Sequence, residues 1–221
     1  MDGLSLTQKY GVECFGATRS QAGRLNNEDA FVIDRDPVPY AAVFDGAGKA
    51  EQAAERVALF FKRLVRDEQG MAGDAAVWAA WVRLMDSHLM GGPQCTFVGA
   101  AVPDPGTARV VGAYAGNSRA YLAVEEGVRL VTAESSPARL GSGRALARVF
   151  SLELRARDIL LLMSDGAWVP FGNAYVLRNA VSTAALRHFS EVPQAVLDAA
   201  TPADGPSDDM TVIALRVRPI K

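Results

Sequence analysis

Two apolar segments of strand length each lead into an Asp-Gly pair. These pairs are Asp45-Gly46, after residues 40–44, and Asp165-Gly166, after residues 159–164. A short apolar run of this kind is typical of a buried strand. An ionised carboxylate at the end of a buried strand is costly unless a partner neutralises it. The pattern therefore predicts a counter-charge beside both aspartates.

A third acidic pair, Asp208 and Asp209, comes directly before an apolar run at residues 210–217. Each aspartate taken alone is equally consistent with a turn cap or an arginine partner. Taken together, strand ends that gather carboxylates would repel one another without cations. Oxygen ligands favour hard divalent ions. The three strand ends therefore predict a carboxylate site that holds more than one metal ion.

The composition suits one folded domain, which we expect to cover residues 1–221, because 49% of the residues are hydrophobic and 22% are charged. A net charge of −2 gives no support for a nucleic-acid or membrane partner. No apolar run reaches the roughly 18 residues of a membrane span, and the first residues do not form a signal peptide. We expect a cytoplasmic protein.

The two cysteines, Cys14 and Cys95, are too few for a disulfide framework and are expected as buried thiols. Arg19 follows Cys14 one position too early for the Cys-x5-Arg loop of cysteine-dependent phosphatases. With two histidines in unrelated segments, a zinc site has no support either. The chemistry is therefore expected to depend on the acids.

Residue periodicity predicts an α+β fold. Strands are expected at residues 10–18, 29–34, 40–45, 95–103, 107–115, 119–124, 128–132, 149–154, 158–163 and 210–217, and helices at 49–66, 74–89, 175–189 and 193–200. The segments 149–154 and 158–163 suggest a hairpin. Trp78 and Trp81 share one helical face and are expected in the core. Few crossovers and two helix pairs predict a four-layer α/β/β/α sandwich, in which helices flank two mainly antiparallel sheets.

The segment at residues 24–29 adds a cation, because Arg24 precedes two acids at a strand start. A guanidinium can hold a phosphate group through two hydrogen bonds. With this segment the chain resembles the PPM family of metal-dependent Ser/Thr protein phosphatases, the protein-phosphatase-2C type, and its bacterial members. The matching motifs follow the family order at residues 24–29, 43–46, 116–121, 164–166 and 207–211.

The resemblance implies a metal-binding role for each matched acid. Asp45 would bridge two metal ions, and the backbone carbonyl of Gly46 would bind one of them. Asp165 and Asp208 would bind the other. The catalytic residues that the resemblance implies are Asp45, Arg24 and Asp165.

Further roles follow from the same resemblance. Arg24 would bind the substrate phosphate, and Glu28 and Asp29 would act on the metals through coordinated water. The family's usual Gly-Asp-Ser-Arg motif has Asn117 in place of its aspartate here. In bacterial relatives that aspartate helps to hold a third metal. Asn117 is therefore expected to be a weakened third-metal position, and a third ion is left open.

The implied reaction is hydrolysis of phosphoserine and phosphothreonine in proteins. Two Mn²⁺ or Mg²⁺ ions, about 3.5–4 Å apart, would activate a bridging water for in-line attack on phosphorus. The expected partners are a phosphorylated protein substrate and, in signalling, a Ser/Thr kinase or its targets, with the phosphatase acting as a monomer. Two alternatives stay open. One is a PPM-fold binding module with weakened catalysis, and the other is a two-metal phosphatase for small phosphorylated metabolites.

Overall fold

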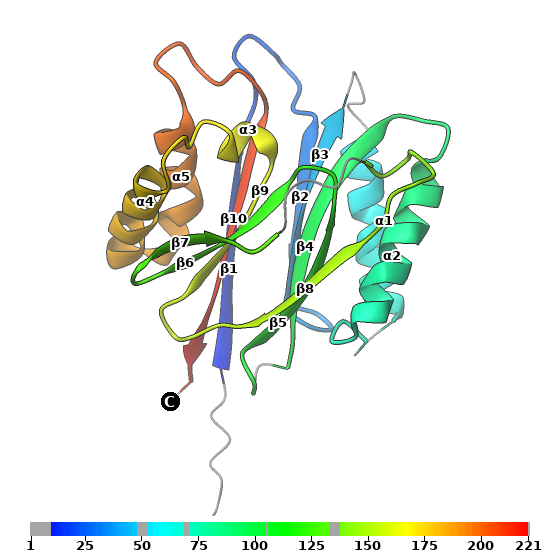
Figure 1. Cartoon of the computed structure of the whole chain (residues 1–221), viewed down its shortest axis with the longest axis horizontal. Coiled ribbons are helices and arrows are strands. Elements are labelled where there is room, and N and C mark those ends of the chain that lie inside the picture. The colour runs from blue at the N-terminus through cyan, green and yellow to red at the C-terminus, as the bar shows by residue number, and fades with distance from the viewer. Residues whose placement is uncertain (1–9, 48–52, 69–70, 105, 133–137, 221) are drawn as a thin grey trace, which may run out of the picture.

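Two five-stranded sheets form the centre of the part of the chain that the structure describes (Figure 1). The structure is a computed structural model that describes residues 10–47, 53–68, 71–104, 106–132 and 138–220. The first sheet has the order β1 (Tyr10–Arg19), β10 (Met210–Pro219), β9 (Ile159–Met163), β6 (Arg119–Val124) and β7 (Gly127–Leu130). The second sheet has the order β2 (Asp29–Asp34), β3 (Tyr40–Ala47), β4 (Gln94–Asp104), β5 (Arg109–Ala115) and β8 (Arg148–Glu153).

Helices cover the outer faces of both sheets (Figure 1). The second sheet is covered by α1 (Ala53–Asp67) and α2 (Ala75–Leu89), and the first by α4 (Ala174–Arg187) and α5 (Val192–Ala200). A short helix α3 (Asp165–Trp168) and a 3-10 turn η1 (Phe189–Glu191) complete the described elements. Within these residues no helix has the length and apolarity to cross a membrane. The expected four-layer sandwich is confirmed, and its described strand pairs are antiparallel.

The helix that follows β3 in the chain forms as its apolar stripe predicts. Helix α1 buries Val57, Phe61 and Val65 against the second sheet, while its charged residues face outward. The first four residues of the helix expected at 49–66 lie outside the described residues. Helix α2 begins where expected, because the Asp74 side chain accepts a hydrogen bond from the Ala76 N–H at 2.8 Å.

An aromatic cluster joins α1 and α2 to the second sheet. The Phe61 ring lies at its centre, with its centroid 5.4 Å from that of Phe97 and 5.9 Å from that of Trp81. Trp78 and Trp81 are fully buried, which confirms that they belong to the core. Edge-to-face packing of these rings stabilises the layer beyond the area that it buries.

The hairpin expected from residues 149–154 and 158–163 is wrong. Strand β8 pairs with β5 in the second sheet, whereas β9 pairs with β10 and β6 in the first. The turn between them is closed by the Arg155 N–H, which donates to the Asp158 carboxylate at 3.0 Å, and it carries the chain from one sheet to the other. Local turn chemistry predicts a reversal of the chain, but it does not decide which sheet each strand joins.

The aromatic cluster generates a stability prediction. Phe61→Ala should lower the free energy of unfolding by about 3–5 kcal/mol, because it leaves a cavity among buried rings. Leu59→Ala, on the exposed face of the same helix with 61% of the side chain accessible, should change it by less than about 0.5 kcal/mol. Urea unfolding followed by tryptophan fluorescence measures both. Equal effects of the two substitutions would contradict this account of the core.

Candidate functional site

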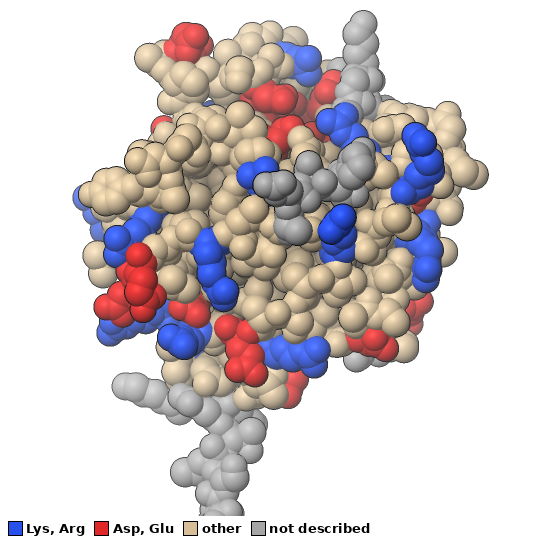
Figure 2. All heavy atoms as spheres, viewed as in Figure 1, with Lys and Arg blue, Asp and Glu red and all other residues tan. Residues whose placement is uncertain are grey.

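Strand register brings four acidic residues to one end of the sandwich. Asp29 at the start of β2 is the cross-strand partner of Asp45 in β3. In the first sheet, Asp165 follows β9 and Asp208 precedes β10, and these two strands are antiparallel neighbours. Together these four residues are the acid cluster. Acidic side chains gather at the upper end of the molecule in Figure 2, over the loops that close the sandwich there in Figure 1.

Both glycines of the Asp-Gly pairs allow two chain segments to approach closely. The Gly46 N–H donates to the Glu28 carbonyl at 3.1 Å, and a Cβ added to Gly46 would lie 2.6 Å from that oxygen. A Cβ added to Gly166 would lie 2.1 Å from the Asp209 carbonyl oxygen. Because any side chain would separate these segments, both glycines are needed to keep the acid-bearing loops together.

Asp209 fastens the loop that carries Arg24. One carboxylate oxygen of Asp209 accepts the Gln21 N–H at 2.7 Å, and the other accepts the Glu28 N–H at 2.6 Å. Asp209 is buried. Its two hydrogen bonds hold the loop at Gln21 and at Glu28, which lie on either side of Arg24 in the chain. The sequence pattern predicts Asp209 only as part of an acidic pair, with no role of its own. Its place directly after Asp208 was the available signal.

Burial and repulsion both disfavour charge in the acid cluster. Burial raises the pKa of Asp45 to about 9, and the charges of the other three members add to that shift. Burial also raises the pKa of Asp29 to about 7 and raises the pKa of Asp208. One carboxylate oxygen of Asp29 is buried without a hydrogen-bond partner among the described residues. A bound cation would relieve this repulsion and satisfy the unpartnered oxygen.

The donors fit a divalent cation by their chemistry, because the acid cluster offers carboxylate oxygens and Gly46 offers a backbone carbonyl. These oxygens do not surround one point as the ligands of a bound metal ion would. In the described part of the chain, no group of three or more His, Cys, Asp or Glu side chains is gathered so as to hold an ion. The carboxylates would therefore have to turn toward a common point to bind one.

Asn117 engages a member of the acid cluster directly. Its side-chain N–H donates to the Asp165 carboxylate at 2.6 Å, and its backbone carbonyl accepts the Trp168 indole N–H at 3.1 Å. The Arg119 guanidinium lies over the Trp168 ring, 3.5 Å from its centroid. These contacts join α3 to the turn before β6. The Asn117 side-chain oxygen is buried without a hydrogen-bond partner in the described residues.

Arg24 and Glu28 lie at the rim of the acid cluster. Their side chains approach to 3.5 Å, and about half of the Arg24 side chain is exposed. Burial raises the pKa of Asp208, and the positive charge of Arg24 opposes that shift. Arg24 is therefore close to the acid cluster and still open to an incoming anion.

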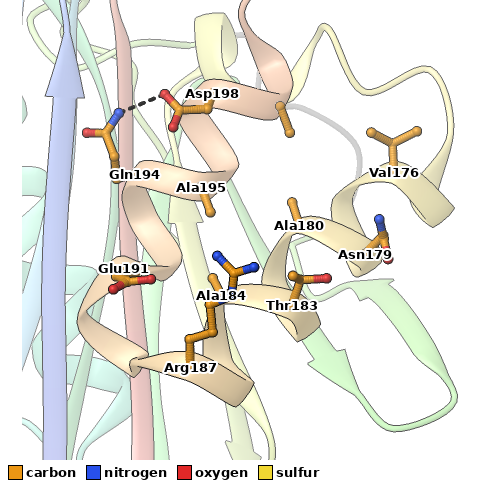
Figure 3. Close-up of a pocket in the computed structure, with 11 residues that line it drawn as sticks. Val176, Asn179, Ala180, Thr183, Ala184, Arg187, Glu191, Gln194, Ala195 and Asp198 are labelled. Carbon is orange, nitrogen blue, oxygen red and sulfur yellow. Dashed lines mark hydrogen bonds between the residues drawn. The ribbon is translucent and has the colours of Figure 1, made fainter.

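The described surface also has hollows, and one of them lies away from the acid cluster. A groove of about 530 Å³ lies between α4 and α5, and Figure 3 shows Ala180, Ala184 and Ala195 along it, with Arg187 and Asp198 among the polar residues around them. None of the site residues expected from the sequence lines this groove. A second hollow, of about 580 Å³ between β2 and α1, reaches Asp29. The acid cluster is thus a different region from the groove in Figure 3.

Comparison with solved structures identifies the fold. The phosphatase domain and regulatory fragment of SpoIIE from Bacillus subtilis match with a TM-score of 0.76 at 18% identity, over 97% of this chain and 65% of that one. A serine/threonine phosphatase from S. agalactiae matches with a TM-score of 0.80 at 15% identity, over 93% and 99%. The catalytic domain of the phosphatase PstP, in complex with two manganese ions, matches with a TM-score of 0.75 at 18% identity, over 95% and 99%.

These identities establish a shared fold. The chain spans about two thirds of the SpoIIE structure that it matches. Comparison with curated protein sequences finds no significant match. The model of the stage II sporulation protein E (SpoIIE) family matches residues 40–218, which include most strands of both sheets. The chain therefore belongs to the SpoIIE family of PPM-type, or protein-phosphatase-2C-type, phosphatases.

Proposed function

We propose that this chain is a metal-dependent phosphoserine/phosphothreonine protein phosphatase, formed by one domain over residues 1–221. The observation that carries the proposal is the acid cluster, which two different sheets assemble at one end of the sandwich. A group of like charges that includes the buried Asp29 and Asp45 is costly for folding alone, so its presence favours a function that uses bound cations. Membership of the SpoIIE family supports the same activity.

In this proposal, Asp45, Asp165, Asp208 and the Gly46 carbonyl would hold two Mn²⁺ or Mg²⁺ ions. Glu28 and Asp29 would act on them through coordinated water. When bound, such ions activate water for attack on phosphorus and offset the charge of the phosphate. The structure of PstP contains two manganese ions, which supports divalent metals in this fold.

The protein's own contribution is to position the substrate and keep the acids in place. Arg24 is half-exposed at the rim, where its guanidinium can take two phosphate oxygens. The Asp209 hydrogen bonds hold its loop at a constant distance from the acid cluster. The substrate is a phosphorylated protein in a signalling pathway, which a Ser/Thr kinase would supply.

A second candidate is a PPM-fold binding module with weakened catalysis. It is favoured by one observation, namely that Asn117 already occupies one carboxylate oxygen of Asp165. A cation at that oxygen must compete with the hydrogen bond. A phosphatase of this fold could also act on small phosphorylated metabolites. The comparison of substrates in the first experiment below separates these candidates.

Metal-dependent turnover is the first expected outcome. The purified chain should hydrolyse p-nitrophenyl phosphate and a phosphothreonine peptide with Mn²⁺ or Mg²⁺, and should be inactive in chelator. Asp45→Asn should reduce the rate to background. It should leave the metal-free melting temperature level or higher, because it removes a buried acid from a repulsive group. Absence of turnover with every metal supports the binding module, and a preference for metabolites over peptides supports the small-molecule phosphatase.

Arg24 should act mainly on substrate binding. Arg24→Ala should raise KM by about tenfold or more, the range lost with a charged hydrogen bond, with a smaller fall in kcat. Arg24→Lys should recover only part of the loss, because an ammonium cannot form the two-bond fork. Steady-state kinetics with the phosphopeptide measures this. Unchanged KM in both variants would make Arg24 a structural residue.

Asn117→Asp should make the protein more dependent on metal. The substitution places a carboxylate oxygen where an N–H now lies 2.6 Å from Asp165, so the metal-free protein should melt at a lower temperature. The rise in melting temperature on adding Mn²⁺ should exceed that of the wild type, because the ion neutralises the new charge. Asn117→Ala, which loses the hydrogen bond without adding charge, is the control. A Mn²⁺-induced rise no larger than the wild type's would exclude a cation position beside Asn117.

A further inference from the structure

A buried carboxylate holds the loop at residues 138–145 in one conformation. Asp86 of α2 is buried and accepts three backbone N–H groups of this loop. The donors are Gly141 at 2.7 Å, Gly143 at 3.1 Å and Ala145 at 3.1 Å. Because three charge-assisted bonds converge on one side chain, this part of the loop is a fixed structure that presents its remaining residues in defined positions.

The same loop is attached to the strand that lies beside Asp45. Leu140 and Cys95 exchange two backbone hydrogen bonds, of 2.9 and 3.2 Å, in an isolated antiparallel bridge at the start of β4. In β4, Cys95 is also the partner of Gly46, and Thr96 is the partner of Asp45. The loop is therefore two strand spacings from β3, about 10 Å between backbones.

Alternation along extended backbone places Arg139 on the side of the acid cluster. The side chains of Cys95 and Leu140 both pack into the core beneath α1 and α2. Successive residues of an extended chain face opposite sides, so Arg139 faces the other side, as Asp45 does. An arginine side chain is long enough to reach across two strands toward that carboxylate.

The charges in this region agree with that placement. Burial raises the pKa of Asp45, and the positive charge of Arg139 opposes this shift. Burial likewise raises the pKa of the Cys95 thiol, again opposed by Arg139. Arg139 is half-buried, and its guanidinium forms no hydrogen bond or ion pair with the residues that the structure describes. The Arg139 guanidinium is thus a positive charge near the acids that forms no ion pair with any of the described ones.

We propose that Arg139 binds the phosphate of the substrate from the Asp45 side of the acid cluster, while Arg24 binds it from the Asp208 side. This inference rests on the proposed phosphatase function. Cations on the acid cluster would neutralise the carboxylates and leave both guanidinium groups for a dianionic phosphate. Two arginines held on separately anchored loops select a phosphomonoester by geometry as well as by charge.

The test separates phosphate binding from a counter-ion role. Arg139→Gln keeps much of the side-chain volume and removes the charge. With saturating Mn²⁺, it should weaken the binding of inorganic phosphate by about tenfold or more in isothermal titration calorimetry and raise KM for p-nitrophenyl phosphate equally. The Mn²⁺ concentration at half-maximal thermal shift should stay at the wild-type value. Arg139→Lys should recover part of the phosphate affinity.

Arg144→Gln is the matched control, because Arg144 is an exposed arginine in the same loop and should leave phosphate binding unchanged. If Arg139→Gln binds phosphate as the wild type does, or shifts only the Mn²⁺ midpoint, the inference is overturned and Arg139 is a counter-ion. A wild type that hydrolyses no phosphate ester contradicts the proposed function instead. In that case the calorimetric comparison still decides whether Arg139 binds phosphate.

Discussion

Mutual repulsion among four clustered carboxylates, of which Asp29 and Asp45 are buried, is the constraint on which this structure depends. Burial raises the pKa of Asp45, and the neighbouring acids raise it further, so the charged cluster opposes folding. The fold withstands that cost because the acids sit at the ends of strands whose other residues form three apolar layers. The repulsive group is thereby confined to one end of the sandwich, where solvent and cations have access.

Backbone contacts, more than ion pairs, keep this end together. Gly46 and Gly166 each allow a neighbouring carbonyl to approach where a side chain could not fit. Asp209 and Asp86 each use both carboxylate oxygens to hold backbone N–H groups, the first in the loop of Arg24 and the second in the loop of Arg139. Two carboxylates thus serve structure beside others that are available for chemistry. The difference lies in hydrogen bonding, since backbone N–H groups donate to both oxygens of Asp209 and Asp86, whereas the charges of other acids raise the pKa of Asp45.

Asn117 has an amide nitrogen where an aspartate would have a carboxylate oxygen, and this one atom changes the charge beside Asp165. Its amide N–H donates to Asp165, so the protein supplies a neutral donor at a place where an aspartate would add to the repulsion. The hydrogen bond also connects to the Trp168 and Arg119 contacts, which fix the start of α3. Metal affinity, the orientation of Asp165 and the local packing are therefore coupled through one side chain.

Sequence alone determined the order of the strands and of the helices other than α3, the burial of Trp78 and Trp81, the sandwich architecture, and the strand ends that carry the acids. Each of these follows from local periodicity or from residues at strand termini. Only the tertiary structure decided that β8 and β9 join different sheets, that Asp209 clamps a loop, that Asn117 donates to Asp165, and that the charge of Arg139 acts on Asp45. These features depend on partners far away in the chain. Strand pairing and hydrogen bonding select such partners by shape and burial in three dimensions, which no local pattern contains.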